Sequence, residues 1–435
     1  MGDRVRGLRE LYRADRERAD AVLWGRRADP RTRRGFLRDS GLAAMAAALG
    51  AEVVFAPAMP EGLIPIALAQ APAPRLLTGK DPGLVVLSEE PLTAETPAHL
   101  LDDDTTPLSR LFVRNNGDVP SIDAASWTLR IDGEAVERPV ELSLAELRRF
   151  EHRSLVLQME CAGNGRAFYT PKVSGSQWTT GAVACPRFDG VRLRDVLARA
   201  GVAPGAVYIG YWGADRKTGG AADEVPISRG VPIAKAMEDE TLLAWSINGE
   251  PLPLLHGAPV RLVCPGWPGS TSGKWLRRIA VRDRVHDGAK MTGHSYRMPC
   301  SPVAAGAEVA AKDMCILEAM PVKSLITRPA TGATHAVGQP LQVSGHAWVG
   351  DGAVAAVDVS IDFGQTWRQA TLEAPPNRLA WQRWRVDLAF RRAGYYEVWA
   401  QATDTNGRAQ PMVTPGWNPE GYANNMCHRI AVTVA

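Results

Sequence analysis

The last third of the chain is a series of short segments in which apolar and polar residues alternate, separated by Gly, Pro, Asp and Asn. From about residue 321, these segments lie at 341–348, 354–361, 381–388, 395–402 and 429–434. Period-two alternation in short runs between turn residues is typical of antiparallel strands. Such spacing repeated over about 100 residues is typical of an immunoglobulin-type sandwich. We therefore predict an immunoglobulin-like β-sandwich over residues 321–435.

Tryptophans are frequent in these predicted strands, where they are flanked by small or polar residues. Large aromatic side chains in such positions usually fill the core between two sheets. We predict a core role for Trp348, Trp367, Trp381, Trp384 and Trp399.

The region before residue 321 has a different pattern, in which short apolar runs alternate with helical spacings. Residues 127–133 are strand-like, whereas 142–150 and 193–200 have leucines at helical intervals, and Ser143 is a candidate N-cap. No Gly-x-Gly-x-x-Gly motif opens a helix, so a doubly wound nucleotide fold is not indicated. A chain of 435 residues exceeds one ordinary core. We predict an α+β protein with a mixed α/β domain over 70–320, followed by the sandwich.

The N-terminus has the features of an export signal. Thr32-Arg33-Arg34-Gly35-Phe36-Leu37 precedes a small apolar run at 41–50, and Ala67-Leu68-Ala69 offers small residues to a signal peptidase. An amphipathic N-terminal helix is the alternative interpretation. The run is too short for a stable membrane span. We predict a twin-arginine signal over residues 1–69 and a periplasmic protein, and we interpret the Ala/Pro-rich residues 50–82 as leader end and linker.

The charge balance bears on possible partners. The whole chain has 50 basic and 47 acidic residues, and the first 69 residues hold 12 and 9 of them, which leaves 38 of each. A net charge of zero in the mature part argues against a nucleic-acid partner.

One decapeptide, residues 157–166 (LQMECAGNGR), places a single cysteine, Cys161, among small residues, with Arg166 five positions later. A thiolate binds soft or high-valent metals well, and small neighbours allow a bulky cofactor to approach the backbone. A lone cysteine is more often an inert buried residue. The decapeptide alone therefore leaves both interpretations open.

The sequence around this peptide resembles the sulfite oxidase family of molybdenum enzymes. The matching segments span roughly residues 100 to 435 in the family's order, and each is moderately specific. They are 112–116 (FVRNN), 178–183 (WTTGAV), 190–201 (GVRLRDVLARAG), 252–261 (LPLLHGAPVR), 273–276 (GKWL), 417–418 (WN) and 428–429 (HR).

The resemblance implies a molybdopterin cofactor whose molybdenum takes Cys161 as its one protein thiolate. It also assigns cofactor-binding roles to Asn115, Asn116, Asp223, His256, Arg261 and Lys274. Asn116 replaces a histidine of the animal enzymes, and the loop that carries Asp223 differs in length from the matching loop of the family. His256 could equally be a turn histidine, and Asp223 could belong to a solvated loop.

For the substrate, the resemblance assigns Arg114, Arg166 and Arg429 as anion-binding arginines, with Trp178 and Tyr296 as aromatic residues lining the same pocket. Guanidinium groups suit an oxyanion such as sulfite because they are planar, bidentate and always charged. Surface ion pairing is the alternative role for each arginine. The Tyr296 match needs a one-residue shift.

No Cys-x-x-Cys-His motif occurs, so we predict no haem in this chain and an external c-type cytochrome as electron acceptor. Cys300 and Cys315 are the cysteines closest in sequence, although a pairing pattern cannot be deduced from spacing. We expect oxidation of sulfite to sulfate by a homodimer or by a heteromer with a cytochrome subunit. The rival hypotheses are a sulfane dehydrogenase subunit, which acts on protein-bound sulfane sulfur in the thiosulfate-oxidising system, and a non-catalytic binding module.

Overall fold

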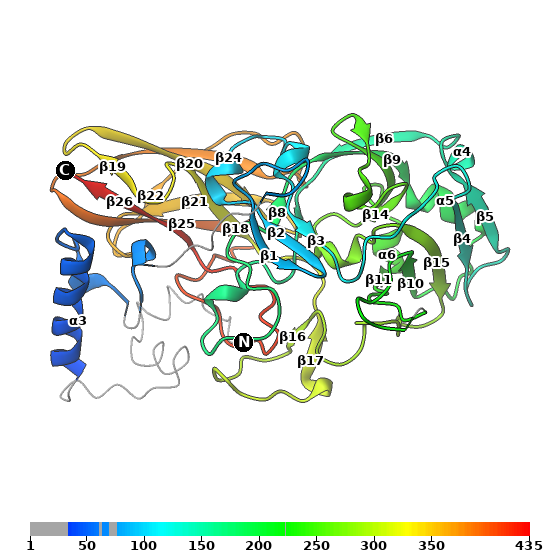
Figure 1. Cartoon of the computed structure of the whole chain (residues 1–435), viewed down its shortest axis with the longest axis horizontal. Coiled ribbons are helices and arrows are strands. Elements are labelled where there is room, and N and C mark those ends of the chain that lie inside the picture. The colour runs from blue at the N-terminus through cyan, green and yellow to red at the C-terminus, as the bar shows by residue number, and fades with distance from the viewer. Residues whose placement is uncertain (1–33, 61–62, 69–75, 222) are drawn as a thin grey trace.

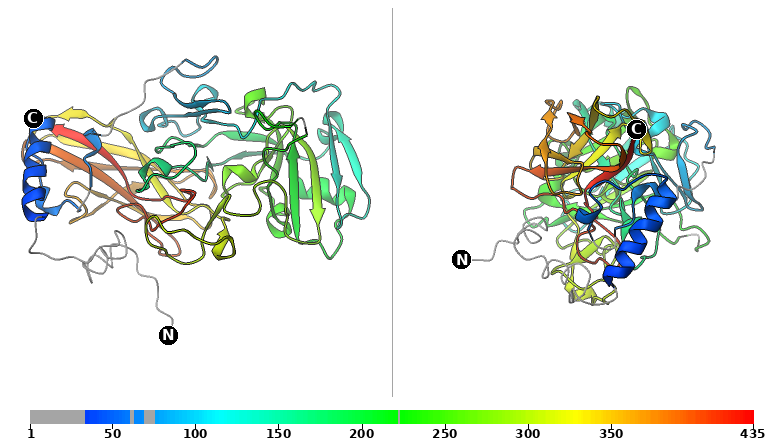
Figure 2. Two further views of the ribbon diagram at one scale, coloured as in Figure 1. Left: turned by 60° about the horizontal axis from the view of Figure 1, so that its bottom comes forward. Right: turned by 90° about the vertical axis from the view of Figure 1, so that its left-hand side faces the viewer.

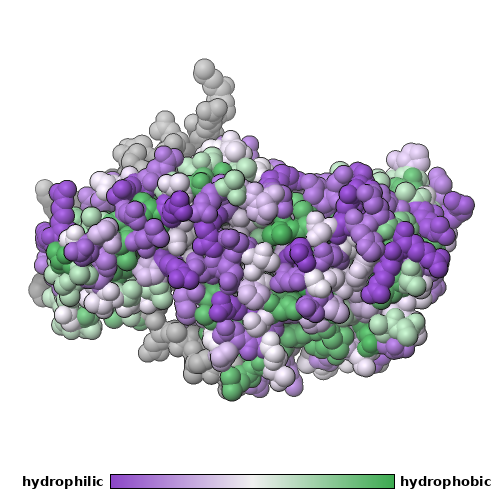
Figure 3. Space-filling model, turned by 90° about the horizontal axis from the view of Figure 1, so that it is seen from above, coloured by the Kyte–Doolittle hydropathy of each residue, from purple (hydrophilic) through white to green (hydrophobic). Residues whose placement is uncertain are grey.

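Two strand-rich bodies lie end to end in this chain (Figure 1). A computed structural model describes residues 34–60, 63–68, 76–221 and 223–435. The C-terminal sandwich occupies the left of Figure 1, and the larger mixed body occupies the right. Figure 3 shows one face of the molecule, on which hydrophilic residues cover most of the area and hydrophobic ones form small separate groups.

The C-terminal body is a sandwich of two sheets, as the alternating segments predict. One sheet has the order β18 (Lys323–Arg328), β20 (Pro340–Trp348), β24 (Gln382–Ala389) and β23 (Thr371–Leu372). The other has the order β19 (Ala333–His335), β26 (His428–Val434), β25 (Gly394–Asp404), β21 (Val354–Ser360) and β22 (Arg368–Gln369). Alternate residues of β24, such as Trp384, Val386 and Leu388, are buried in the core between the sheets. The immunoglobulin-like prediction is confirmed.

Of the five predicted tryptophans, Trp384 lies in the core between the two sheets. Trp399 packs on the outer side of its own sheet and half-buried Trp367 packs against the same outer cluster, so the prediction of a sandwich core was wrong for both. Trp348 and Trp381 are also buried, but they contact Leu101 and Val183 of the front body. For these two residues the prediction of a sandwich core was wrong, because their side chains fill the junction between the two bodies.

The front body is built around two five-stranded sheets. The first has the order β11 (Gly230–Pro232), β10 (Tyr208–Gly213), β15 (Leu276–Arg282), β4 (Thr128–Asp132) and β5 (Val140–Ser143). The second has β13 (Glu250–Pro251), β12 (Leu242–Ile247), β9 (Arg187–Arg192) and β6 (His152–Val156), with β14 (Arg261–Val263) beside β12. A shared apolar core, with residues such as Leu129, Leu197 and Leu262, joins the sheets.

Short helices and strand pairs complete the fold. The α-helices of the front body are α4 (Leu144–Leu147), α5 (Leu193–Ala200) and α6 (Ile233–Ala236). Smaller sheets join β1 (Val85–Glu89), β2 (Leu92–Glu95) and β3 (Val113–Arg114), then β7 (Met159–Glu160) with β8 (Val183–Ala184), and β16 (Arg297–Pro299) with β17 (Met314–Ile316). The 3-10 turns are η1 (Ala56–Ala58), η2 (Ile66–Leu68), η3 (Ala98–Leu100), η4 (Leu108–Arg110), η5 (Arg166–Phe168), η6 (Leu254–His256), η7 (Gly269–Thr271) and η8 (Ala311–Asp313).

The two helices expected from leucine spacing have different outcomes. Helix α5 coincides with the predicted 193–200 and buries Leu193, Val196 and Leu197. In the other segment, Ser143 caps α4 in a reciprocal capping box with Glu146, as predicted. However, Leu142 belongs to strand β5, where it faces Leu129 of β4, and α4 ends at Leu147.

The N-terminal region packs onto the sandwich. Helix α3 (Arg34–Leu49) lies across the end of the sandwich (Figures 1 and 2). After it, Val53 and Val54 are buried, and the Val54 amide donates to the Tyr395 carbonyl at 3.0 Å. The Ile66 amide donates to Glu397 at 2.8 Å. Residues 52–60 and 63–68 are therefore part of the packed structure, and describing 50–82 as leader end and linker was wrong for them.

Of the predicted signal over residues 1–69, residues 1–33, 61–62 and 69 lie outside the described residues, among them Thr32, Arg33 and Ala69 of its two motifs. Within the described ranges, no helix is both long and apolar enough to cross a bilayer.

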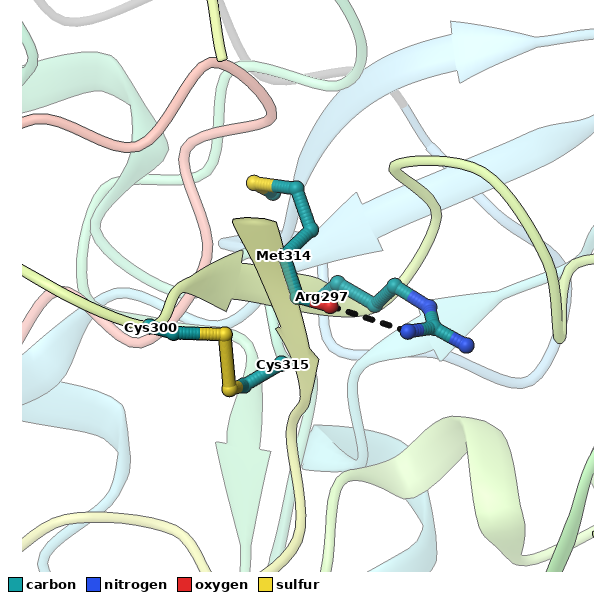
Figure 4. The surroundings of a disulfide bond; sticks show 4 residues. All are labelled: Arg297, Cys300, Met314 and Cys315. Carbon is teal, nitrogen blue, oxygen red and sulfur yellow. Dashed lines mark hydrogen bonds between the residues drawn. A yellow bond between two sulfur atoms is a disulfide. The ribbon is translucent and has the colours of Figure 1, made fainter. Parts of the chain in front are cut away.

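A disulfide between Cys300 and Cys315 joins the β16–β17 pair (Figure 4). Beside it, Arg297 Nη1 donates to the Met314 carbonyl at 2.9 Å. The other four cysteines, among them Cys161, are not disulfide-bonded and are buried. Burial of Cys185 raises its pKa to about 12, which agrees with a core role for that thiol.

Candidate active site

A cleft in the front body brings together most of the predicted site residues. Its empty volume is about 880 Å³ when the open solvent at its mouth is included. The predicted residues that line it are Arg114, Asn116, Cys161, His256, Arg261, Lys274 and Tyr296. Asn115 and Trp178 lie directly behind this lining, as their contacts below show.

Cys161 follows strand β7 at the inner wall of the cleft. Its amide donates to the Ala182 carbonyl at 2.9 Å, and its carbonyl accepts from the Asn164 amide at 2.9 Å. The side chain packs with Trp178 and Ala182 and is 9% exposed. Cys161 is thus held on a short turn that is hydrogen-bonded on both sides, and it lines the cleft.

Glu160, the residue before Cys161, anchors this turn to the sandwich. Its carboxylate is completely buried and pairs with the Lys323 ammonium from β18. The same carboxylate accepts from Trp348 Nε1 at 2.9 Å and from Asn164 Nδ2 at 2.9 Å. A buried carboxylate with several donors of this kind is well satisfied. The position of Cys161 consequently depends on residues of the C-terminal body.

Trp178 and Arg166 lie on the sandwich side of Cys161. Trp178 is fully buried and packs edge-to-face with Phe112, with 6.2 Å between the ring centroids. Arg166 is 7% exposed, and it donates to the Glu420 carbonyl at 2.9 Å and to the Ser176 carbonyl at 3.0 Å. A Cβ on Gly163 would come within 2.8 Å of the guanidinium carbon, so only glycine leaves room for Arg166 there.

Cationic side chains surround the opposite wall. Arg114, at the end of β3, donates to Asn116 Oδ1 at 3.1 Å, and Lys290 donates to the same oxygen at 2.9 Å. Lys274 bonds to Asn115 Oδ1 and to the Leu255 carbonyl. Burial lowers the pKa of Lys274 well below its usual value, and it lowers the pKa of Lys290 to about 8.

His256 is buried beside Lys80, which donates to His256 Nε2 at 2.6 Å. Burial, followed by the charges of Lys80 and Lys274, lowers the pKa of His256 well below its ordinary value. The low pKa favours the neutral imidazole, whose Nε2 can accept a hydrogen bond from the Lys80 ammonium. Arg261 donates to the His256 carbonyl at 3.0 Å and to the Ser272 carbonyl at 2.9 Å, and burial lowers its pKa to about 10.

Several buried donors of this site have no partner among the described residues. They include Arg114 Nη1, Asn115 Nδ2, Trp178 Nε1, Arg261 Nε and Ser270 Oγ. Buried donors without partners cost free energy, so a site that contains several of them is built for a ligand rich in acceptor oxygens. A pterin that carries a phosphate has this chemistry, and the cations around the cleft match its charge.

The metal-binding capacity of the cleft is limited to one thiol. Within the described ranges, no three His, Cys, Asp or Glu side chains gather as a metal site. Cys161 could therefore hold a metal only if the cofactor itself supplies the other donor atoms, as the dithiolene of a molybdopterin does. The residues present fit that group.

Arg429 is not brought to this cleft, and its assignment as an anion-binding residue was wrong. It lies on β26, donates to Glu397 at 3.2 Å and has its guanidinium over the Trp399 ring at 5.8 Å. Its physical role is to satisfy a fully buried carboxylate of the sandwich.

Asp223 is exposed in a surface loop, so its assignment to the cofactor was also wrong. The aspartate that lines the cleft is Asp215, two residues after β10. Burial raises the pKa of Asp215 to about 6. Its position directly after a strand that leads into the cleft was the signal that could have identified it.

Asp215 should give the cofactor-free protein a pH-dependent stability. Because its pKa rises from 3.8 to about 6 in the fold, the folded chain binds this proton more tightly than the unfolded chain does. The free energy of unfolding should therefore fall as pH rises through this interval. Urea unfolding of wild type and Asp215→Asn at several pH values between these two pKa values tests this. The free energy of unfolding of the variant should lack the part of the pH dependence that Asp215 causes. Equal slopes in the two proteins would contradict the assignment.

Comparison with known proteins gives consistent matches. The model of the oxidoreductase molybdopterin binding domain matches residues 116–290, and the model of the Mo-co oxidoreductase dimerisation domain matches 314–435. Sulfite oxidase of Gallus gallus is 37% identical over 365 residues, which cover 80% of this chain and 78% of that protein. Mitochondrial sulfite oxidase of Homo sapiens is 35% identical over 374 residues, 82% of this chain and 67% of that protein.

Among solved structures, the sulfane dehydrogenase SoxCD from Paracoccus pantotrophus is similar with a TM-score of 0.68 and 28% identity, covering 86% of this chain and 95% of that one. The fold, the cleft and these matches define the protein as a molybdopterin-dependent oxidoreductase. More particularly, the chain belongs to the sulfite oxidase family.

Besides Asp215, three further residues at or beside the site were missed by sequence reasoning. Lys80 lies in a segment that was interpreted as linker, and Lys290 and Tyr422 lie in loops without a recognisable pattern. Tyr422 stacks on Tyr296 with ring centroids 5.1 Å apart. No periodicity identifies such residues, because only the closed fold brings them to the cleft.

Proposed function

We propose that this enzyme oxidises sulfite to sulfate. The observation that carries the proposal is a cleft with a single thiol in its wall, several cations around it and unpartnered buried donors. In the reaction, sulfite and water give sulfate, two protons and two electrons. The molybdenum cofactor, when bound through Cys161, supplies the two-electron redox chemistry and the oxygen transfer that side chains lack.

The contribution of the protein is electrostatic orientation. Arg114 lines the cleft with an unpartnered Nη1, and Tyr296 presents its ring to the same space. Arg166 is held in place by the two backbone carbonyls to which it donates and by the Tyr422 ring beneath its guanidinium. A buried guanidinium stabilises an oxyanion much more than it would in water, because it is oriented in advance and screened little. Asn115, Asn116, His256, Arg261 and Lys274 would hold the pterin and its phosphate.

The electrons leave the chain in our proposal through a c-type cytochrome, because the sequence has no haem attachment motif. We propose that the sandwich joins two copies or binds a cytochrome subunit. The match of residues 314–435 to a dimerisation domain supports an assembly of this kind.

A sulfane dehydrogenase activity is the second candidate. It is favoured by the similarity to the SoxCD sulfane dehydrogenase over 95% of that chain. In this case the anionic site would accept a sulfur atom that is borne by a carrier protein.

The test compares the two substrates on one preparation. Enzyme matured with its export signal should contain molybdenum, and it should reduce cytochrome c with free sulfite alone. Reduction that requires a persulfidated carrier protein, with no rate on free sulfite, would replace our proposal by the second candidate. A folded protein without molybdenum under these conditions would contradict both.

Arg166→Gln should raise the KM for sulfite by roughly 10- to 100-fold, since one charge-assisted contact to a desolvated oxyanion contributes about 1.5–3 kcal/mol. Steady-state kinetics on molybdenum-loaded enzyme measure this. Unchanged KM and kcat would place Arg166 outside the substrate site.

We also propose that the protein is exported to the periplasm through the twin-arginine pathway. The Cys300–Cys315 disulfide supports an oxidising compartment. The packing of residues 52–60 and 63–68 on the sandwich makes the cleavage position a specific question. N-terminal sequencing of the exported protein decides it: a start near residue 70 would remove Val54 from the sandwich core, whereas an earlier start would retain it.

A further inference from the structure

Arg229 is a buried cation that no assigned role explains. It precedes β11, and its side chain is 1% exposed. Its Nη1 donates weakly to the Lys290 carbonyl at 3.4 Å, whereas its Nε and Nη2 have no partner among the described residues. No carboxylate of the described ranges forms an ion pair with it. Such a charge is costly in a protein interior unless it serves a ligand or a site.

The surroundings of Arg229 are aromatic instead of acidic. Its guanidinium carbon lies over the Tyr296 ring at 4.7 Å from the centroid. Burial lowers its pKa, and the groups that oppose this most are the hydroxyls of four tyrosines, Tyr296, Tyr211, Tyr208 and Tyr422. Aromatic faces attract a cation without neutralising it. The positive charge of Arg229 is therefore available to the cleft that Tyr296 and Tyr211 line.

The contact with Tyr296 is one step in a continuous stack. Tyr296 lies nearly parallel to Tyr422, with an interplanar angle of 12° and centroids 5.1 Å apart. Tyr422 in turn has the guanidinium carbon of Arg166 over its ring at 5.1 Å. The order Arg229, Tyr296, Tyr422, Arg166 places a cation at each end of two stacked rings.

The backbone shows that Tyr296 needs this support. Its φ of 51° lies in the left-handed region, which is unfavourable for a residue with a large side chain. Tyr422 is fixed beside Ala423, whose amide donates to the Ala162 carbonyl next to Cys161 at 2.9 Å. The stack thus joins Tyr296 to the turn that carries Cys161. Arg229 lies at the end of the stack that is farther from this turn in the order of contacts, against the Tyr296 ring.

We propose that Arg229 is a positioning residue for a doubly charged oxyanion, acting through Tyr296. It holds the Tyr296 ring against Tyr422, and it supplies the third guanidinium of the substrate site after Arg114 and Arg166, a role that Arg429 cannot fill. This inference rests on the proposed oxidation of sulfite, because it assigns the same cleft a dianionic substrate.

The experiment compares Arg229→Gln, Arg229→Lys and wild-type holoenzyme in two measurements. The first is the steady-state KM and kcat with sulfite, and the second is the Kd of inorganic sulfate by titration calorimetry. Arg229→Gln should raise both KM and Kd by about 5- to 10-fold, as expected for the loss of one unit charge a few ångströms away in a partly buried site. Its kcat should change by less than about twofold, because the charge attracts bound anion and transition state alike. Arg229→Lys should restore both values in part at acidic pH and less at alkaline pH, since a buried lysine keeps its charge only below its lowered pKa.

A matched control is Arg278→Gln, which removes another guanidinium that lies over an aromatic ring, Trp212, at 4.4 Å. The Arg278 side chain is 42% exposed and does not line the cleft, so both measurements should stay at their wild-type values.

The outcomes separate this inference from the proposed function. If wild type does not oxidise sulfite but Arg229→Gln still weakens sulfate binding, the proposed function fails and the inference stands. Unchanged KM and Kd in Arg229→Gln, with only a lower thermal stability, would show a purely structural role and overturn it. If Arg229→Gln does not fold, Arg229→Lys decides. A sulfate Kd that weakens with rising pH more steeply in Arg229→Lys than in wild type supports the role of charge, and the same pH dependence in both proteins overturns it.

Discussion

Replacing Cys161 by serine should lower turnover with sulfite by several orders of magnitude while the protein still folds. An alkoxide is a poor electronic substitute for a thiolate on a redox metal, whereas the pterin would still be held by the many polar groups of the cleft. The substitution is nearly isosteric, and the turn that carries Cys161 depends on backbone hydrogen bonds to Ala182 and Asn164. Molybdenum content, pterin content and rate per molybdenum should be measured on the same sample.

Cys185→Ala is the control for the loss of a buried thiol. Cys185 packs at the junction of the two bodies and does not line the cleft, so its removal should affect stability more than rate. Wild-type turnover in Cys161→Ser would refute its assignment as the metal ligand.

Lys323→Met should destabilise the protein by about 3–5 kcal/mol, because it leaves the Glu160 carboxylate buried without its cation. Glu160 is completely buried and Lys323 is 6% exposed, so water cannot replace the lost partner. Denaturant unfolding of cofactor-free protein measures the effect. The double variant Glu160→Gln with Lys323→Met should be less destabilised than Lys323→Met, since it removes both charges together.

Arg328→Met is the matched control for this ion pair. Arg328 follows on the same strand and pairs with Asp102, but its side chain is 70% exposed. Exposed pairs contribute about 0–1 kcal/mol. Equal losses in Lys323→Met and Arg328→Met would show that burial does not set the strength of the Glu160 interaction.

The elements that local pattern controls could be predicted from the sequence. The sandwich strands follow from alternation, as Trp384, Val386 and Leu388 of β24 illustrate, and the cap at Ser143 follows from its side-chain chemistry. The cleft residues near the motifs, such as Cys161 and Lys274, were found because the family resemblance reached them. Their catalytic and binding roles remain predictions, since geometry shows only where they lie.

What could not be predicted depends on contacts between distant segments. Arg429 and Arg229 are both arginines beside aromatic residues, and only the fold shows that the first meets a carboxylate and the second does not. Asp215 and Asp223 lie eight positions apart in one connection, but only one of them faces the cleft. Trp348 fits the strand pattern of a sandwich core, yet its indole reaches across to Glu160 of the other body.

The link from Lys323 and Trp348 to Glu160 makes the two bodies poor candidates for exchange as independent modules. A chimera that takes its sandwich from a relative would need an ammonium and an indole at these positions to keep the Cys161 turn in place. It would also need a ring at Tyr422 to continue the stack from Tyr296. Recombination of the two domains is therefore constrained at the catalytic turn itself, and sequence change at these positions should be coupled across the domain boundary.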